Sequence, residues 1–178
     1  MRIRVEEIKE SNRSITFPED VGEVNDLLSL SNSVDYRFTG AAEVSVKYYR
    51  SGEDLFFEGR LVSPVSGTCA RCLESYPFEI DRGFTFVLKP AREATTAEPS
   101  LSEEDLALSF YSGEEVDLSP LLREEMLLSL PTRPLCREDC SGLCPRCGKN
   151  RNTAPCACSE ERLDPRLAPL RDLKLRSR

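Results

Sequence analysis

The cysteines are the residues of this 178-residue chain that are best suited to chemistry. Six of the eight lie between Cys136 and Cys158, among Pro, Gly, Asn and Arg residues that supply few apolar side chains for a core. A segment of this composition folds through disulfides or a metal ion, or it does not fold at all. The rest of the chain decides among these possibilities.

Composition and the first residues favour a reducing compartment. The chain is 39% apolar and long enough for one ordinary domain with an appendage. Its first residues, MRIRVEEIKE, lack the apolar region of a signal peptide, and no run reaches the roughly 18 apolar residues of a membrane span. We therefore expect a cytoplasmic protein without a membrane partner, whose cysteines are metal ligands or redox groups rather than disulfides.

The spacing of the last four cysteines predicts a zinc site. Cys144 and Cys147, in CPRCG, can present two thiolates from one tight turn, and Gly148 can adopt the backbone conformation that turns amides toward sulfur. Cys156 and Cys158, in CAC, supply a second pair. We expect these four sulfurs to bind Zn²⁺, with an iron–sulfur cluster as the main competitor for such ligands.

The other four cysteines permit a second site. Cys69 and Cys72, in CARC, lie at the tip of a predicted hairpin, and CREDC supplies Cys136 and Cys140. Eight sulfurs suit two closed zinc sites per chain. The grouping stays open, because Cys140 can instead join the first site, and Cys69 and Cys72 can be free thiols or a redox pair.

The sequence favours a protein that is not an enzyme. It has no histidine, which removes the commonest general base and metal co-ligand at neutral pH. All-cysteine zinc sites are closed, so they fold a chain and do not activate water. No P-loop, GxSxG or dinucleotide fingerprint occurs, and we expect no small-molecule substrate. A thioredoxin-like motif needs a following helix, whereas the strand-like LESYPFEI follows Cys72.

Charge divides the chain into an acidic body and a basic tail. Residues 1–130 hold 13 Lys and Arg against 25 Asp and Glu (−12), whereas residues 131–178 hold 11 against 6 (+5). An acidic body suits basic partners, and a basic tail suits phosphate. The candidate RNA contacts in the tail are Arg146, Lys149, Arg151 and Arg166, although solvation alone explains them equally well.

Alternating apolar residues predict an antiparallel meander of three strands. The alternation runs over residues 34–48, with a bend at Gly40, and continues over 55–61 after the turn-like RSGED. A third strand spans 76–88 in YPFEIDRGFTFVL. The segments RIRV and SITF predict edge strands, and PEDVGEVNDLLSL predicts a short helix.

One longer helix is predicted to cover the apolar face of this sheet. In LSPLLREEMLLSLP, Ser119 is the expected cap, Pro120 suits the first turn and Pro131 ends the run. The apolar stripe on this helix consists of Leu118, Leu121, Leu122, Met126 and Leu130. The predicted fold class is therefore α+β, an antiparallel β-meander covered by a helix, with a C-terminal all-cysteine zinc-binding segment.

Two units are predicted along the chain. Residues 1–130 form the sheet and its helix, with an acidic, solvated connection at 91–116 and one helical turn from Ser102. Residues 131–178 form the cysteine-rich basic tail, in which DPRLAPLRDLK is expected to dock on the body through Leu167, Leu170 and Leu173.

Several of these strings together resemble the YceD family of bacterial and plastid proteins. They are CARCLESY, VDLSPLLREEMLLSLPTRPLC, CSGLCPRCGKN, CAC and DPRLAPLRDLK, in this order over roughly residues 60 to 178. The resemblance implies a role in 23S ribosomal RNA accumulation and large ribosomal subunit biogenesis, without an established enzymatic activity. It implies a large-subunit ribosomal protein, an assembly factor or precursor 23S RNA as partner. The alternatives are a zinc-stabilised adaptor that binds protein only, with an indirect effect on rRNA, and a thiol redox protein.

Overall fold

The computed structural model describes residues 1–30, 35–91, 108–158 and 166. The helical turn expected from Ser102 and the docking segment around Leu167, Leu170 and Leu173 lie outside these residues. In the described part of the chain, no helix is long and apolar enough to cross a membrane.

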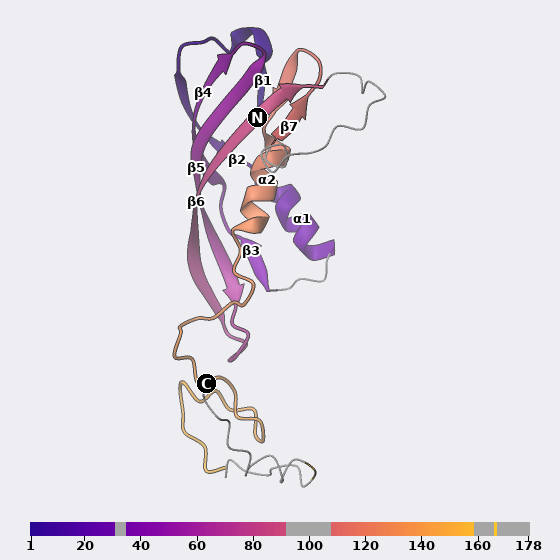
Figure 1. The fold of residues 1–178 in the computed structure, drawn as a ribbon. Coiled ribbons are helices and arrows are strands. Elements are labelled where there is room, and N and C mark those ends of the chain that lie inside the picture. Colours follow the sequence, from indigo (N-terminus) through magenta and orange to yellow (C-terminus); the bar gives the residue numbers. More distant parts are fainter. Residues whose placement is uncertain (31–34, 92–107, 159–165, 167–178) are drawn as a thin grey trace, which may run out of the picture.

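A six-stranded, mostly antiparallel sheet forms the body (Figure 1). Its strands are β2 (Arg13–Glu19), β3 (Tyr36–Phe38), β4 (Ala42–Ser51), β5 (Asp54–Thr68), β6 (Ser75–Pro90) and β7 (Leu108–Tyr111). The order is β2-β4-β5-β6-β7, with β3 paired to β5. The fold is thus mixed α+β, and the predicted meander is present as β4, β5 and β6.

The turn residues match the predicted connections. Ser51 pairs with Asp54 across the β4–β5 hairpin, and Gly52 has a φ of 62°, which glycine adopts without steric cost. The strand predicted over residues 34–48 is divided near Gly40, where Ser63 donates a hydrogen bond to the Gly40 carbonyl. Both halves nevertheless pair with β5, so the long strand β5 keeps them in one sheet.

The acidic connection contains strands that the sequence did not predict. Strand β7 runs parallel to β6, and β8 (Glu115–Asp117) pairs with β1 (Arg2–Arg4) in a separate two-stranded sheet. The connection predicted at 91–116 therefore contains strand residues at 108–111 and from 115 on, although most of its described residues are exposed. These strands have three or four residues each, too few to show a period of two.

Two helices, rather than one, cover the sheet. They are α1 (Gly22–Leu30) and α2 (Ser119–Leu128), and a short 3-10 helix, η1 (Val5–Glu7), follows β1. Figure 1 shows both α-helices on the same side of the sheet. Leu118, Leu122 and Met126 of the predicted stripe are buried, as core packing requires.

The start of α2 differs from the prediction in its cap. The Ser119 side chain does not cap the helix; Asp117 Oδ1 instead accepts a hydrogen bond from the Ser119 amide at 3.0 Å. Pro120 lies in the first turn, where its missing N–H costs nothing. A carboxylate at this position also interacts favourably with the positive end of the helix dipole.

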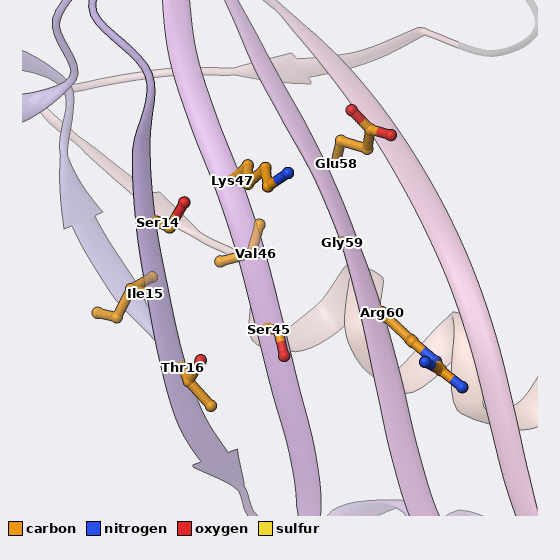
Figure 2. Close-up of a pocket in the computed structure, with 9 residues that line it drawn as sticks. All are labelled: Ser14, Ile15, Thr16, Ser45, Val46, Lys47, Glu58, Gly59 and Arg60. Atoms are coloured by element: carbon orange, nitrogen blue, oxygen red, sulfur yellow. The ribbon is translucent and has the colours of Figure 1, made fainter.

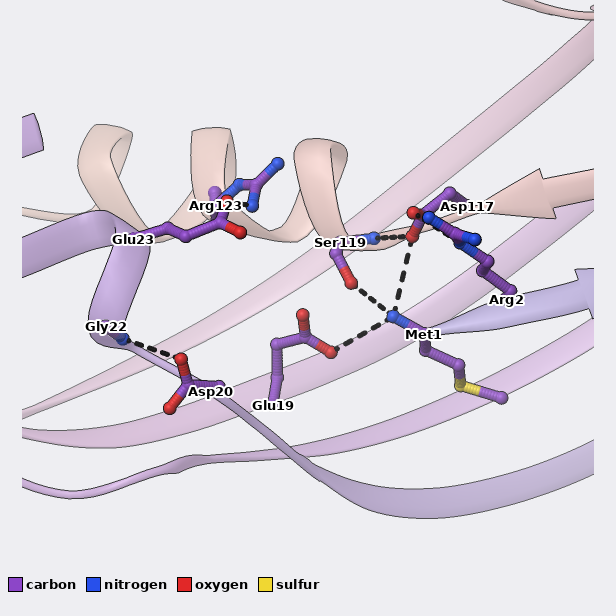
Figure 3. A network of polar contacts seen from close by, with 9 residues as sticks. All are labelled: Met1, Arg2, Glu19, Asp20, Gly22, Glu23, Asp117, Ser119 and Arg123. Carbon is purple, nitrogen blue, oxygen red and sulfur yellow. Dashed lines mark hydrogen bonds and ion pairs between the residues drawn. The ribbon is translucent and has the colours of Figure 1, made fainter. Parts of the chain in front are cut away.

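A polar cluster fastens the N-terminal residues to α2 (Figure 3). The Met1 ammonium contacts the Ser119 hydroxyl and lies 3.4 Å from the buried Glu19 and 3.5 Å from Asp117. Buried charge of this kind is tolerated because it is paired. Nearby, Arg123 of α2 forms an ion pair with Glu23 of α1, which joins the two covering helices.

Gly59 of β5 tests how tightly this sheet is packed. A Cβ at this position would lie 2.5 Å from Cζ of Phe84 and press against the Ser45 carbonyl. We expect Gly59→Ala to lower the free energy of unfolding by about 1–3 kcal/mol, because the Ser45 carbonyl belongs to the backbone of the neighbouring strand and cannot move without distorting the sheet. Urea unfolding followed by circular dichroism measures this loss.

Gly83 of β6 is the matched control. A Cβ there would meet only the Gly59 carbonyl, at 3.8 Å, which is ordinary contact. Gly83→Ala should leave stability unchanged or raise it by up to about 1 kcal/mol. Equal losses in the two variants would contradict this account of the packing.

Candidate metal centres

All eight cysteines gather into two groups of four. We call Cys69, Cys72, Cys136 and Cys140 the hairpin centre, and Cys144, Cys147, Cys156 and Cys158 the tail centre. Within each group all sulfurs lie within 4.8 Å of one another, and all eight cysteines are free of disulfides. Cys140 lies with the hairpin group and not with the tail group, and Cys69 and Cys72 are not isolated.

The sulfur separations in the hairpin centre fit a tetrahedral metal site. Cys69 and Cys140 have their sulfurs 3.8 Å apart, and Cys72 and Cys136 are 3.7 Å apart. Zn–S bonds of about 2.3 Å in a tetrahedron place neighbouring sulfurs about 3.8 Å apart. These groups can therefore bind metal ions, and zinc is compatible with their ligands and their size.

The two CxxC turns have the same backbone structure. The amide four residues after the first cysteine donates to that cysteine's carbonyl, Leu73 to Cys69 and Gly148 to Cys144, each at 2.9 Å. The first cysteine's own amide then donates to the carbonyl five residues on, at 2.9 Å in the hairpin and 2.8 Å in the tail. Leu73 and Gly148 have φ values of 60° and 69°. Gly148 thus has the backbone conformation that the sequence predicted for it. Leu73 adopts the same conformation in the hairpin turn, although it has a side chain.

The turns aim amides at one sulfur of each group. Burial raises the pKa of the Cys69 thiol, but N–H groups of Cys136, Cys72 and Arg71 outweigh it and bring the pKa to about 6. The N–H groups of Cys147 and Arg146 lower the pKa of Cys144 to about 6. The thiolate is the form that binds metal, so one ligand of each group ionises readily near neutral pH.

One other thiol in each group resists ionisation without a cation. Burial and the neighbouring sulfurs raise the pKa of Cys136 to about 12, and contact with Cys147, followed by burial, raises that of Cys158 to about 12. Four thiolates at these separations repel one another. A bound divalent cation removes this penalty, because it attracts every sulfur in the group.

Outer contacts surround the hairpin centre, and the sequence did not predict them. Asn152 Nδ2 lies 3.3 Å from Cys140 Sγ. Arg71, between Cys69 and Cys72, donates from Nη1 to the carbonyls of Glu138 and Cys140, at 3.2 and 2.8 Å. Arg71 and Asn152 both lie between cysteines in the sequence, and polar partners commonly orient metal ligands. That position is the signal by which these contacts could have been predicted.

The hairpin tip and the tail are joined by backbone hydrogen bonds. The Ala70 amide donates to the Pro134 carbonyl at 2.9 Å, and the Leu143 amide donates to the Arg71 carbonyl at 3.0 Å. Gly142, with a φ of 68°, packs so closely that a Cβ would lie 3.0 Å from the Arg71 carbonyl. The first part of the tail is therefore assembled on the β5–β6 hairpin, while the division of the chain at residue 130 stays a prediction.

The four candidate RNA-contact residues are all exposed. Arg146, Lys149 and Arg151 lie within or just after the tail turn, and Arg166 is the one described residue beyond residue 158. Three cations on one small loop region form a surface that phosphate can approach. Contact with RNA stays a prediction.

A pocket on the sheet offers a second surface. The pocket has a volume of about 290 Å³. Polar and apolar residues of β2, β4 and β5 line it (Figure 2). Its charged residues are Lys47, Glu58 and Arg60, all exposed, and Arg60 pairs with Asp81 of β6. Water solvates exposed charges of this kind, so they need no ligand to stabilise them. The two cysteine groups are therefore the stronger candidate site.

Comparison with known proteins assigns the family. The family model described as large ribosomal RNA subunit accumulation protein YceD matches residues 57–174, which include all eight cysteines. The chain belongs to the YceD family. The family resemblance inferred from the sequence is thereby confirmed, and the family's name describes a role in accumulation of the large-subunit ribosomal RNA.

Similar proteins occur in bacteria and plants. An uncharacterised protein of Mycobacterium tuberculosis is 33% identical over 118 residues, covering 66% of this chain and 55% of that protein. YlbN of Bacillus subtilis, also uncharacterised, is 27% identical over 168 residues and covers 90% of this chain and 88% of that protein. The chloroplastic large ribosomal RNA subunit accumulation protein YCED homolog 1 of Arabidopsis thaliana is 26% identical over 169 residues, 79% of this chain and 50% of that protein.

The coverage of these proteins is uneven. The chain spans about half the length of the mycobacterial relatives it matches, 55% for the Mycobacterium tuberculosis protein. No solved structure matches this chain. The centres described above therefore rest on the chain's own geometry.

Gly142 tests the joint between hairpin and tail. We expect Gly142→Ala to cost about 1–2 kcal/mol for its positive φ, and more for the clash with Arg71. Gly148→Ala has the same φ penalty, but its Cβ meets nothing within 4 Å, so it controls for backbone strain. Hydrogen exchange of the Ala70 and Leu143 amides should become faster in Gly142→Ala and not in Gly148→Ala. The same exchange rates in both variants would show that the close approach is unimportant.

Proposed function

We propose that this chain is a non-enzymatic, zinc-binding factor in the biogenesis of the large ribosomal subunit, which it supports by promoting 23S rRNA accumulation in the cytoplasm. Membership of the YceD family supports the cellular role. The observation that carries the molecular part is the convergence of eight thiols into two groups of tetrahedral size. Closed four-sulfur sites stabilise a fold and leave no position for substrate.

Each part of the molecule has a proposed partner. The acidic sheet body, with a formal charge of −12 over residues 1–130, suits a basic large-subunit ribosomal protein or assembly factor. The exposed cations Arg146, Lys149, Arg151 and Arg166 suit the phosphates of precursor 23S rRNA. Phosphate contacts of this kind position a protein without reading sequence.

The second candidate is an adaptor that binds protein only. The negative charge of the body favours it, because RNA repels a surface of that sign. In that case the effect on rRNA passes through the bound protein. The two candidates share the zinc centres and differ in whether the complex contains RNA.

Metal content tests the structural part of the proposal. We expect two zinc ions per chain, and Cys144→Ser should lose one of them and disorder the tail, because structural zinc supplies most of the folding free energy of such segments. Elemental analysis, with thiol titration before and after a chelator, measures this. Thiols that react fast and selectively in the untreated protein would indicate the redox alternative instead.

Capture from growing cells tests the partner. The tagged chain is isolated at moderate salt with and without RNase, and 23S precursor RNA and large-subunit proteins are quantified together. We expect enriched precursor RNA that is lost at higher salt, because phosphate contacts release counterions. Arg146→Glu with Lys149→Glu should reduce this enrichment.

Arg13→Glu with Lys47→Glu serves as the charge-matched control, since both residues are exposed cations, on β2 and β4, outside the tail. It should leave RNA enrichment unchanged. Protein partners that persist after RNase, without RNA enrichment in the unaltered chain, would contradict direct RNA contact and favour the adaptor.

A further inference from the structure

Asn152 belongs to one centre by sequence and contacts the other in space. It lies between the tail-centre ligands Cys147 and Cys156, yet its Nδ2 donates to Sγ of Cys140 in the hairpin centre at 3.3 Å. Its Oδ1 accepts hydrogen bonds from the Ser141 amide and from Nη2 of Arg137, both at 2.8 Å. The Asn152 side chain is thus hydrogen-bonded to the sulfur of Cys140, a ligand of the hairpin centre, and to the backbone amide of the next residue.

A chain of hydrogen bonds holds Asn152 in place. Its backbone amide donates to Asn150 Oδ1 at 2.9 Å, and Asn150 Nδ2 donates to Glu74 Oε1 at 2.6 Å, next to the hairpin turn. The Arg151 amide donates to the Gly142 carbonyl at 2.9 Å. Residues 150–152 therefore form a bridge from the tail turn to the hairpin centre.

Apolar packing does not hold this bridge. No residue from 145 to 158 is buried. The segment is fixed at its ends by Cys147 and Cys156, whose sulfurs belong to the tail centre. A metal ion on those sulfurs orders the segment that carries Asn152, whereas a tail centre without metal leaves it to hydrogen bonds that are exposed or only partly buried.

We infer that Asn152 is a positioning residue for the hairpin centre, and that metal in the tail centre strengthens metal binding in the hairpin centre through it. The amide N–H stabilises the Cys140 thiolate and fixes its direction, as outer partners of metal ligands do. The coupling is reciprocal by thermodynamic necessity. This inference rests on the proposed zinc centres and goes beyond them, because two independent sites would serve the proposed function equally well.

The test is a zinc competition titration of the full chain against a chromogenic chelator. Cadmium NMR of the cadmium-loaded protein identifies which centre each binding step fills, since Cys144→Ser removes the resonance of the tail centre. Asn152→Asp keeps the oxygen that faces Ser141 and replaces the N–H donor with a second oxygen. We expect it to weaken metal binding at the hairpin centre by roughly 10–100-fold.

Thr153→Ala is the matched control in the same loop. Thr153 Oγ1 donates to the Asn150 carbonyl at 3.1 Å, so this variant also loses a hydrogen bond, but not one to sulfur. It should leave the affinity of the hairpin centre unchanged. A shift of the Cys140-bound cadmium resonance in Asn152→Asp, and not in Thr153→Ala, separates sulfur positioning from loop stability.

A double-mutant cycle tests the coupling. Cys144→Ser changes no ligand of the hairpin centre, yet it should weaken that centre by a factor similar to Asn152→Asp. Asn152→Asp should add little in the Cys144→Ser background, because the contact is already lost there. Unchanged hairpin affinity in either single variant, or additive effects, would overturn the inference.

The same titration separates this inference from the proposal on which it rests. Two bound metal ions with independent affinities in the unaltered chain would overturn the coupling alone. An unaltered chain that binds no metal would overturn both.

Discussion

The C-terminal part of the structure depends on the gathering of cysteine sulfurs into two groups, each of which can bind a metal ion. Among the described residues from 131 to 158, the buried ones are Pro134, Cys140, Gly142 and Cys144. So little apolar burial cannot offset the loss of chain entropy. Eight thiols placed in two tetrahedral groups supply the missing free energy once metal is bound, and the turns, glycines and amide contacts around them all serve that placement.

The body of the molecule provides the other half of this arrangement. Strands β5 and β6 have 15 and 16 residues, and Figure 1 shows their hairpin extending well beyond the two covering helices. At roughly 3.3 Å per residue, strands of this length span about 50 Å. The hairpin thus carries Cys69 and Cys72 out to Cys136 and Cys140, and half of one centre belongs to the turn between β5 and β6. Sheet and tail are for this reason coupled, although their compositions differ sharply.

The sequence predicted the features that depend on local pattern. Alternation revealed the meander, and the apolar stripe of α2 identified Leu122 and Met126 as core, because both signals repeat over many residues. It did not predict β7 and β8, which are short and lie at the end of an acidic stretch. The Ser119 cap was wrong because Leu118 holds the N-cap position, so Ser119 is already helical and its hydroxyl contacts the Met1 ammonium instead.

For the candidate centres too, the sequence predicted what depends on neighbouring residues but not what depends on contacts between distant ones. CxxC spacing indicated the two turns, but spacing alone left open which pairs share a centre, because that depends on how the β5–β6 hairpin meets the tail. The structure brings Cys69 and Cys72 to Cys136 and Cys140. The contact between Asn152 and Cys140 joins residues twelve positions apart, and no sequence motif predicts it.

Zinc K-edge X-ray absorption of the purified chain tests the central claim most directly. If metal–sulfur bonds organise the tail and join it to the hairpin, the average zinc ion has a first shell of four sulfurs at about 2.3 Å, with no nitrogen or oxygen ligand. A shell containing oxygen or nitrogen would mean that the eight cysteines do not form two closed centres. Absence of zinc from a chain whose tail is still ordered would contradict the account altogether.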